Sequence, residues 1–143
     1  MQFLDTNIIL RFLTGDDPKK QAACSELFTQ IERGEISVVV PDVVIAEVVF
    51  VLSSPRTYNH SRQEVAGLLT PLLHLSHLVV QNRHILMRAL RIYADTQDLD
   101  FPDAYIVASM EQTESNTLFS YDRGFDDFPF ITREEPQPIK QAT

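Results

Sequence analysis

The sequence contains few of the residues that several common protein classes need. It has one cysteine, Cys24, so no disulfide can form within the chain, which favours a reducing compartment. Its four glycines do not form a phosphate-binding or dinucleotide-binding motif. No apolar run approaches the ~18 residues of a membrane span, and the start does not have the basic segment of a signal peptide. We therefore expect a soluble, cytoplasmic protein with no membrane partner.

Basic residues are scarce in the last third of the chain. The 143 residues include 20 acids and 12 bases, which gives a net charge of −8. Residues 1–94 hold nine of each, so residues 95–143 carry the whole excess, with eleven acids against Arg123, Arg133 and Lys140. This balance argues against non-specific binding of nucleic acid by a basic surface. It is compatible with a nucleic-acid enzyme whose acids bind metal, because bound ions reverse the local charge.

Strand and helix patterns alternate along the chain, which is typical of an α/β domain with a mostly parallel sheet. The sequence predicts strands at 2–5, 36–40, 78–80, 117–121 and 130–131. It predicts a helix from Thr6, a helix from Pro18 to Gly34 with Asp17 as N-cap, and a helix over 43–52 with Asp42 as cap. Further helices are predicted at 61–73, at 83–96 and from Pro102. The chain from Arg133 onward is expected to be irregular. We assign residues 1–135 to a single domain and 136–143 to an irregular tail.

Four of the acids occupy positions that solubility does not explain, and two of these acids follow strands. Asp5 ends one predicted strand, and Asp122 comes directly after another. Functional groups gather beyond the carboxyl ends of the strands in an open parallel sheet. Taken alone, Asp5 is better explained as a helix N-cap and Asp122 as a turn residue. Two strands that each lead into an aspartate nevertheless favour a shared site.

The other two acids lie on predicted helices. Glu47 is the only charge within 43–52, which we interpret as a buried helix, and a buried carboxylate must be neutralised, pair with a cation or bind metal. No lysine or arginine lies at helical spacing from Glu47, although a salt bridge from elsewhere in the chain is the plain alternative. The helix dipole explains an acid at Asp103, in the first turn of its helix. Because Asp100 already caps that helix, Asp103 is free for a second role.

Carboxylates that lie close together raise one another's pKa values unless a cation neutralises them. A site made only of carboxylates favours Mg²⁺ or Mn²⁺ over zinc, and such ions suit phosphodiester hydrolysis. The sequence shows no serine–histidine or cysteine–histidine nucleophile pattern. The histidines have no ligand-like spacing and are expected to be surface or packing residues; they are His60, His74, His77 and His84.

Four motifs occur in order along nearly the whole chain: Phe3–Leu13, the lone Glu47 in an apolar helix, Phe101–Ala104 and Ser120–Phe125. Together they resemble the PIN-domain family and, within it, the VapC-type toxin ribonucleases. The resemblance implies a three-layer α/β/α sandwich with a central, mostly parallel sheet. It implies that Asp5 and Asp103 are the main ligands of Mg²⁺ or Mn²⁺ and that Glu47 and Asp122 complete the site. It also implies bracing polar residues, which are Thr6, Asn7 and Ser120.

The same resemblance implies an endoribonuclease toxin that acts on RNA, forms a homodimer and is inhibited by an antitoxin helix in an apolar groove. Candidates for this groove or for the dimer surface are Phe50, Leu52, Leu68, Leu69, Leu72 and Leu73. For most of them ordinary core packing is the better explanation. The family often has a further acid near the position of Gly124. Asp126 is a candidate substitute for that acid, although a solvated turn explains Asp126 equally well.

Two other functions stay open at this point. A haloacid-dehalogenase-like phosphohydrolase also has an aspartate after its first strand, but that chemistry needs a second aspartate two residues later, where this chain has Asn7. A non-catalytic, partner-binding module with the PIN fold is the other alternative. The expected signature of such a module is the loss of one of the four acids, and this chain retains all of them.

Overall fold

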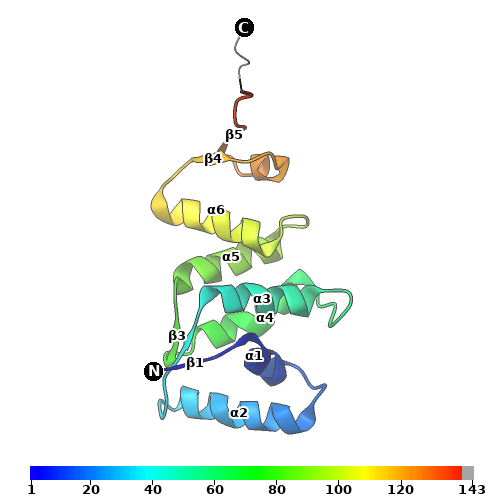
Figure 1. The fold of residues 1–143 in the computed structure, drawn as a ribbon, viewed down its shortest axis with the longest axis vertical. Helices are drawn as coiled ribbons and strands as arrows, with labels where there is room; N and C mark the ends of the chain where they lie inside the picture. Colours follow the sequence, from blue (N-terminus) through cyan, green and yellow to red (C-terminus); the bar gives the residue numbers. More distant parts are fainter. Residues whose placement is uncertain (140–143) are drawn as a thin grey trace.

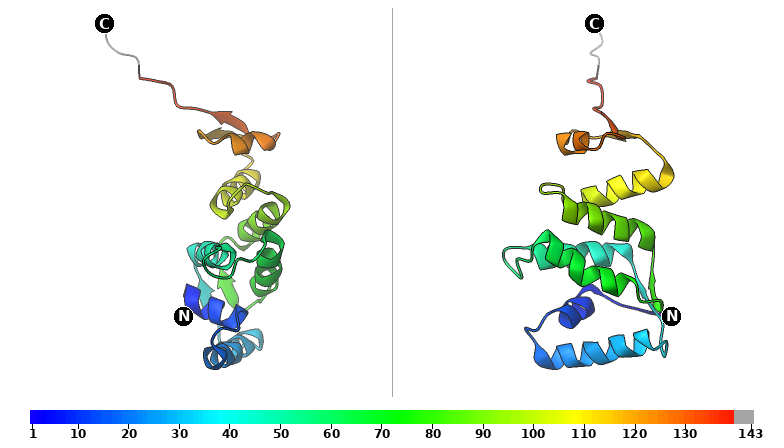
Figure 2. Two further views of the ribbon diagram at one scale, coloured as in Figure 1. Left: turned by 90° about the vertical axis from the view of Figure 1, so that its right-hand side faces the viewer. Right: turned by 180° about the vertical axis from the view of Figure 1, so that it is seen from behind.

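The computed structural model describes residues 1–139, and in it two α-helices connect each of the first three strands to the next (Figure 1). In chain order they are β1 (Gln2–Phe3), α1 (Thr6–Leu13), α2 (Pro18–Glu32), β2 (Val38–Val40), α3 (Asp42–Ser53), α4 (Arg62–Leu73), β3 (Leu78–Val80), α5 (Arg83–Asp95), α6 (Phe101–Thr113), β4 (Thr117–Phe119), the 3₁₀ helix η1 (Arg123–Asp127) and β5 (Thr132–Glu134). The molecule is elongated, with α2 near one end, and β4, β5 and η1 beyond α6 at the other (Figure 2).

Capping residues begin the first two helices where the sequence predicts. The Oδ1 atom of Asp5 accepts hydrogen bonds from the backbone N–H groups of Asn7 and Ile8, at 3.0 and 3.4 Å. Asp17 accepts from the N–H of Lys20 at 3.1 Å, and α2 ends just before Gly34, whose φ of +74° favours glycine. These local signals confirm the predicted boundaries of α1 and α2.

The later helices also follow the prediction, with one difference at the start of α3. Asp42 is the first residue of α3 and not its cap, because Pro41 occupies the capping position and makes no side-chain bond. The Asp42 carboxylate accepts instead from the hydroxyl of Tyr105, at 3.0 Å, and from the amide of Asn82, at 3.2 Å. A residue expected to serve its own helix therefore joins α3 to α6.

The five strands form two parallel sheets. In the first sheet β2 lies between β1 and β3, and Phe3, Val39 and Val79 stand side by side in register. In the second sheet β4 pairs with β5, with Phe119 opposite Glu134. The predicted α/β fold with parallel strands is confirmed. The structure adds that the strands fall into a sheet of three and a sheet of two.

The last strand lies later than predicted, and Arg133 explains why. It was expected at 130–131 but spans Thr132–Glu134, so Arg133 belongs to a strand and not to an irregular tail. Its side chain, 11% exposed, donates to Asp126 at 3.0 Å, to Glu135 at 2.8 Å and to the Ser120 carbonyl oxygen at 2.9 Å. These bonds fasten β5 to β4 and η1. Beyond β5, residues 135–139 of the predicted tail have no regular structure, and 140–143 lie outside the described residues.

The core lies between the helices and one face of the three-stranded sheet. The largest fully buried side chains include Ile9, Ile31, Ile45, Leu52, Leu69, Leu73, Leu78, Leu86 and Leu90. Cys24 is buried, as expected of a small apolar residue. Four of the six groove candidates are core residues, namely Leu52, Leu69, Leu72 and Leu73, whereas Phe50 is 71% exposed. Within residues 1–139, no helix is long and apolar enough to cross a membrane.

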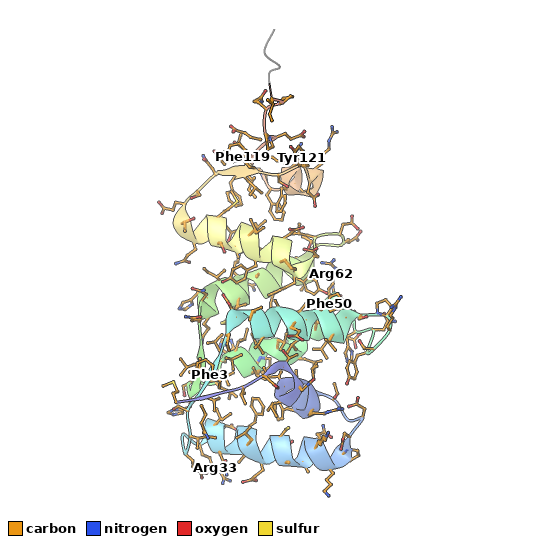
Figure 3. All side chains as sticks on the ribbon, viewed as in Figure 1. Phe3, Arg33, Phe50, Arg62, Phe119 and Tyr121 are labelled. Atoms are coloured by element: carbon orange, nitrogen blue, oxygen red, sulfur yellow. The ribbon has the colours of Figure 1, made fainter. Side chains whose placement is uncertain are left out.

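The N-terminal end of α6 is held against the rest of the molecule. Arg62, on α4, donates hydrogen bonds to the carbonyl oxygens of Tyr93 and Leu99 and lies over the Tyr93 ring, 4.4 Å from its centroid. Arg62 and Phe50 line one shallow pocket together with Pro102, and Figure 3 shows their side chains close to each other. Together with the bond from Tyr105 to Asp42, these contacts place the first turn of α6 beside α3.

Candidate functional site

Two of the predicted site acids belong to the N-terminal part of the molecule and are connected by Thr6. Asp5 is exposed at the end of β1, and both of its hydrogen bonds to the start of α1 use Oδ1. Thr6 is buried, and its hydroxyl donates to Oε2 of Glu47, on α3, at 2.9 Å. Thr6 therefore orients Glu47 toward the end of β1. We refer to Asp5 and Glu47 as the N-terminal acid pair.

The predicted burial of Glu47 is wrong. Its side chain is exposed, because other elements cover α3 on one side only. The buried residues of α3 are Ile45, Val48, Val49 and Leu52, while Val43 and Phe50 lie on the exposed side. An apolar composition does not show which face of a helix its neighbours cover. Burial therefore gives no reason for Glu47 to bind a cation, and its placement beside Thr6 is the observation that remains.

The other two acids belong to the C-terminal part. Asp103 is half-buried in the first turn of α6, and its N–H donates to the capping carboxylate of Asp100 at 3.0 Å. Burial raises the pKa of Asp103, and so do the charge of Asp100, a hydrogen bond with Asp100 and the charge of Asp122. The charge of Asp122 is the smallest of these contributions. We refer to Asp103 and Asp122 as the C-terminal acid pair.

The turn after β4 fixes Asp122. The Ser120 hydroxyl accepts from the N–H of Asp122 at 3.0 Å, and Oδ1 of Asp122 accepts from the N–H of Gly124 at 2.8 Å. A Cβ atom at position 124 would lie 3.1 Å from that same oxygen, so this tight turn leaves little room for a side chain there. Asp126, the candidate substitute for the accessory acid, forms an ion pair with Arg133 at 3.0 Å.

The two acid pairs do not meet in this conformation. Among the residues that the structure describes, no three aspartate, glutamate, histidine or cysteine side chains lie together as a metal site requires. Phe3 lies just before the N-terminal pair, and Tyr121 lies just before Asp122. Figure 3 shows these two residues well separated along the long axis, and α5 and α6 lie at levels between them. The carboxylate oxygens fit Mg²⁺ or Mn²⁺ chemically, but each pair alone offers too few of them.

Sequence comparison decides the family. A family model described as the PIN domain matches residues 3–131. The chain belongs to the PIN-domain family. The resemblance carried by the four motifs is thereby confirmed. This PIN domain is also 24% identical, over 132 residues, to a VapC ribonuclease of Aquifex aeolicus (strain VF5), an alignment that covers 92% of this chain and 95% of that protein.

One charged neighbour in the PIN domain was missed at the sequence level. Asp100 was interpreted only as a helix cap, yet it also contributes to the raised pKa of Asp103. The signal was present, because residues three apart lie on the same face of a helix turn. The hydrogen bond from Thr6 to Glu47 had no such signal, since 41 residues separate the two in sequence.

Proposed function

We propose that this PIN domain is the toxin of a toxin–antitoxin pair, a VapC-type endoribonuclease that hydrolyses RNA phosphodiester bonds with Mg²⁺ or Mn²⁺. The family match and the similarity to a VapC ribonuclease over 92% of the chain support this function. The observation that carries it is that the chain has all four acids of the predicted site, Asp5, Glu47, Asp103 and Asp122, within the residues that the PIN model matches. Burial raises the pKa of Asp103, and the charges of Asp100 and Asp122 raise it further. Repulsion of this kind is relieved when a cation binds.

The residues of both acid pairs have separable roles in this proposal. Asp5 and Asp103 would be the main metal ligands, and Glu47 and Asp122 would complete the site. When bound, the ion would supply an activated water and polarise the phosphate. Thr6 holds Glu47 through its hydroxyl, and Ser120 holds the backbone of Asp122. The backbone N–H of Asn7 helps to orient the Asp5 carboxylate.

Charge makes the cation necessary for substrate binding as well as for chemistry. The chain carries a net charge of −8, and the C-terminal acid pair lies in the part that carries the whole excess. RNA phosphates approaching this surface meet carboxylates of the same sign. A divalent ion between the carboxylates and the phosphate removes that repulsion.

The direct test is RNA cleavage by the purified protein with Mg²⁺, with Mn²⁺ or with EDTA. We expect cleavage of structured RNA only with metal, and a loss on the order of 10²-fold or more in Asp5→Asn and in Asp103→Asn. Asp95→Asn is the matched control, because Asp95 is an exposed acid of the same acidic segment that belongs to neither pair and does not line the cavity beside Asp122. Wild-type rates in both Asp5→Asn and Asp103→Asn would contradict the assignment.

The proposed antitoxin would bind the apolar groove between α3 and α6. This groove has a volume of about 310 Å³ and is lined by Asp42, Val43, Ala46, Phe101, Pro102, Tyr105 and Ile106. Val43 and the nearby Phe50 are among the most exposed large apolar residues of the chain. A groove of this kind suits the apolar face of a helix. Val43→Asp, in the lining of this groove, should weaken antitoxin binding in calorimetry and leave RNA cleavage unchanged.

The second candidate function is a non-catalytic PIN-fold module that binds a protein partner. The separation of the acid pairs favours it, because neither pair alone is a metal site. Calorimetric titration with Mn²⁺ distinguishes the two functions. A nuclease should show a saturable site that Asp103→Asn removes, and a non-catalytic module should show none. The PIN match favours both of these functions over a haloacid-dehalogenase-like phosphohydrolase.

A further inference from the structure

A cavity lies between α4 and α5, and none of the four site acids lines it. Its volume is about 650 Å³, within the range of cavities that hold small organic ligands. At one end Gln63, on α4, donates a hydrogen bond to the carbonyl oxygen of Ala94, on α5, at 2.8 Å. At the other end Arg83, on α5, donates to the carbonyl oxygen of Leu75, just after α4, at 3.3 Å. These bonds hold the two helices side by side (Figure 2), so the cavity forms without a ligand.

The α5 side of this cavity presents two guanidinium groups. Arg88 and Arg91 are exposed and lie three residues apart, which places them on the same face of α5. Glu111 binds Nε and Nη2 of Arg88, at 2.7 and 3.0 Å, and leaves the Nη1 group of Arg88 outside this pair. Within residues 1–139, Arg91 forms no hydrogen bond or ion pair. Asp95 also lines the cavity, and as an acid it cannot bind an anion. Arg91 therefore offers unused donors to an anionic ligand.

The α4 side of the cavity contains a glycine that internal packing does not require. Gly67 lies in the interior of α4, where glycine is less favourable than other residues. A Cβ atom at this position would meet no neighbouring group within 4 Å. Pro71, four residues later, has no N–H to donate to the Gly67 carbonyl oxygen. This side of the cavity therefore presents uncovered backbone, with a hydrogen-bond acceptor that lacks its usual helical donor.

Unused guanidinium donors opposite uncovered backbone suit a nucleotide of single-stranded RNA. Arginine binds phosphate through charge-assisted hydrogen bonds. A flat base can lie against Gly67 and against the apolar side chain of Met87, which also lines the cavity. An amino or imino group of that base can donate to the Gly67 carbonyl oxygen. The base must be unpaired, because the edges and faces of a base in a duplex are already occupied. The choice of RNA as the ligand rests on the proposed function.

We propose that the cavity between α4 and α5 is a second RNA-binding site, in which Arg91 and Arg88 bind a phosphate and one unpaired base lies against Gly67. Because this site contains neither acid pair, a short RNA should bind there without a divalent ion. At the cleavage site, by contrast, carboxylates oppose the phosphates until a cation binds. In a longer substrate the second site adds affinity and does not contact the bond that is cleaved. It should therefore lower KM and leave kcat unchanged.

Arg91→Ala tests the phosphate contact. A fluorescently labelled RNA tetranucleotide, titrated in EDTA and followed by anisotropy, should bind the wild type saturably and Arg91→Ala about tenfold more weakly. The slope of log K against log salt concentration should also decrease by about 0.7, because one phosphate contact is lost. Arg33→Ala is the matched control and should bind like the wild type, since Arg33 is an exposed arginine at the end of α2 (Figure 3). No binding by the wild type, or equal losses in the two variants, would overturn the proposal.

Gly67→Leu tests the position of the base. The new side chain extends into open space, so the protein should fold, and its Tm should not fall because leucine favours a helix more than glycine does. The same side chain occupies the place of the base, so binding of the tetranucleotide should weaken by about tenfold or more. Ala23→Leu, on the exposed face of α2, is the matched control and should bind like the wild type. A folded Gly67→Leu protein that binds RNA as tightly as the wild type would overturn the proposal.

Two further measurements separate this site from the proposed cleavage activity. With Mn²⁺ and a longer RNA, Arg91→Ala should raise KM about tenfold and leave kcat unchanged. An active enzyme whose KM does not change, and which does not bind the tetranucleotide, would overturn the second site and leave the proposed function intact. Specific binding in EDTA by a protein that cleaves no RNA would support the second site and overturn the nuclease. Displacement of the tetranucleotide by an acidic peptide at the same concentration as unlabelled RNA would overturn the assignment to RNA.

Discussion

Each of the two sheets of this PIN domain has a strand that leads into an aspartate, Asp5 after β1 and Asp122 after β4. The electrostatic surroundings of these two aspartates differ. In the N-terminal sheet Asp5 caps α1 through two backbone N–H groups, and Glu47 accepts a hydrogen bond from Thr6. In the C-terminal part, Asp103 and Asp122 lie in the segment that carries the whole net charge of −8. Both aspartates that follow strands accept backbone hydrogen bonds. The comparison shows that the C-terminal pair differs in Asp103, whose pKa is raised by burial and by the charges of Asp100 and Asp122.

The largest expected effect comes from adding and removing metal. With Mn²⁺ at 100 times its dissociation constant, the folded protein should gain ~2.7 kcal/mol in unfolding free energy. This gain corresponds to a rise in Tm of roughly 5–10 °C for a chain of this size. Differential scanning fluorimetry with Mn²⁺ and with EDTA measures it. If the C-terminal pair depends on a cation, Asp103→Asn should abolish the rise, and an undiminished rise would show that the ion binds elsewhere.

Thr6→Val tests how far the N-terminal pair depends on protein hydrogen bonds. The substitution keeps the side-chain volume and removes the hydroxyl that donates to Glu47. We expect RNA cleavage to fall by about 10–100-fold, as for other residues that orient metal ligands. Thr6→Ser keeps the hydroxyl and should retain most of the activity. Equal cleavage rates for the valine and serine variants would show that the Thr6 hydroxyl does not support cleavage.

Arg133→Leu tests what holds the C-terminal sheet together. It removes the bonds to Asp126, Glu135 and the Ser120 carbonyl oxygen, while the first two partners lie at the surface. We expect a loss of roughly 1–2 kcal/mol in unfolding free energy, mostly from the buried part of this network. Urea unfolding of the variant and the wild type measures the loss. Arg123→Leu, an exposed arginine in η1, is the control and should lie within about 0.5 kcal/mol of wild type.

The smallest effect concerns pH. The fold raises the pKa of Asp103 above its ordinary value of 3.8, so the ionised carboxylate destabilises the metal-free protein at neutral pH, and this penalty disappears as the pH falls below 3.8. Asp103→Asn should therefore raise the Tm in EDTA at pH 7 by ~1–2 °C. The difference from wild type should vanish near pH 3.5, provided that both proteins remain folded there. A lower Tm for the variant at pH 7 would contradict the penalty that burial and the neighbouring charges place on the ionised carboxylate.

Local signals explain how much of the fold the sequence predicts. Asp5, Asp17 and Asp100 cap their helices as expected, because a cap depends on residues within one turn. The last strand was misplaced because Phe130 and Ile131 form an apolar pair that resembles a strand, whereas Arg133 secures β5 through contacts to Ser120 and Asp126. Such contacts between segments do not appear in a local pattern.

In the candidate site, too, local features were predicted from the sequence and contacts between distant segments were not. Asp5, Asp103 and Asp122 were predicted from their positions at strand ends and at a helix start, and Glu47 because it is the only charge in an apolar segment. These are all local features. The exposure of Glu47 was not predicted, because it depends on which elements cover α3. The split into two sheets was also beyond local reasoning, since strand pairing joins residues far apart in the chain.

The central claim is that the two acid pairs act as one metal site, and Mn²⁺ calorimetry of four proteins tests it most directly. These are the wild type, Asp5→Asn, Asp103→Asn and the double variant. The account predicts that either single substitution removes nearly all Mn²⁺ binding, so that the double variant loses nothing further. It would be contradicted if each single variant lost only part of the binding and the losses added in the double variant, because the two pairs would then bind metal independently.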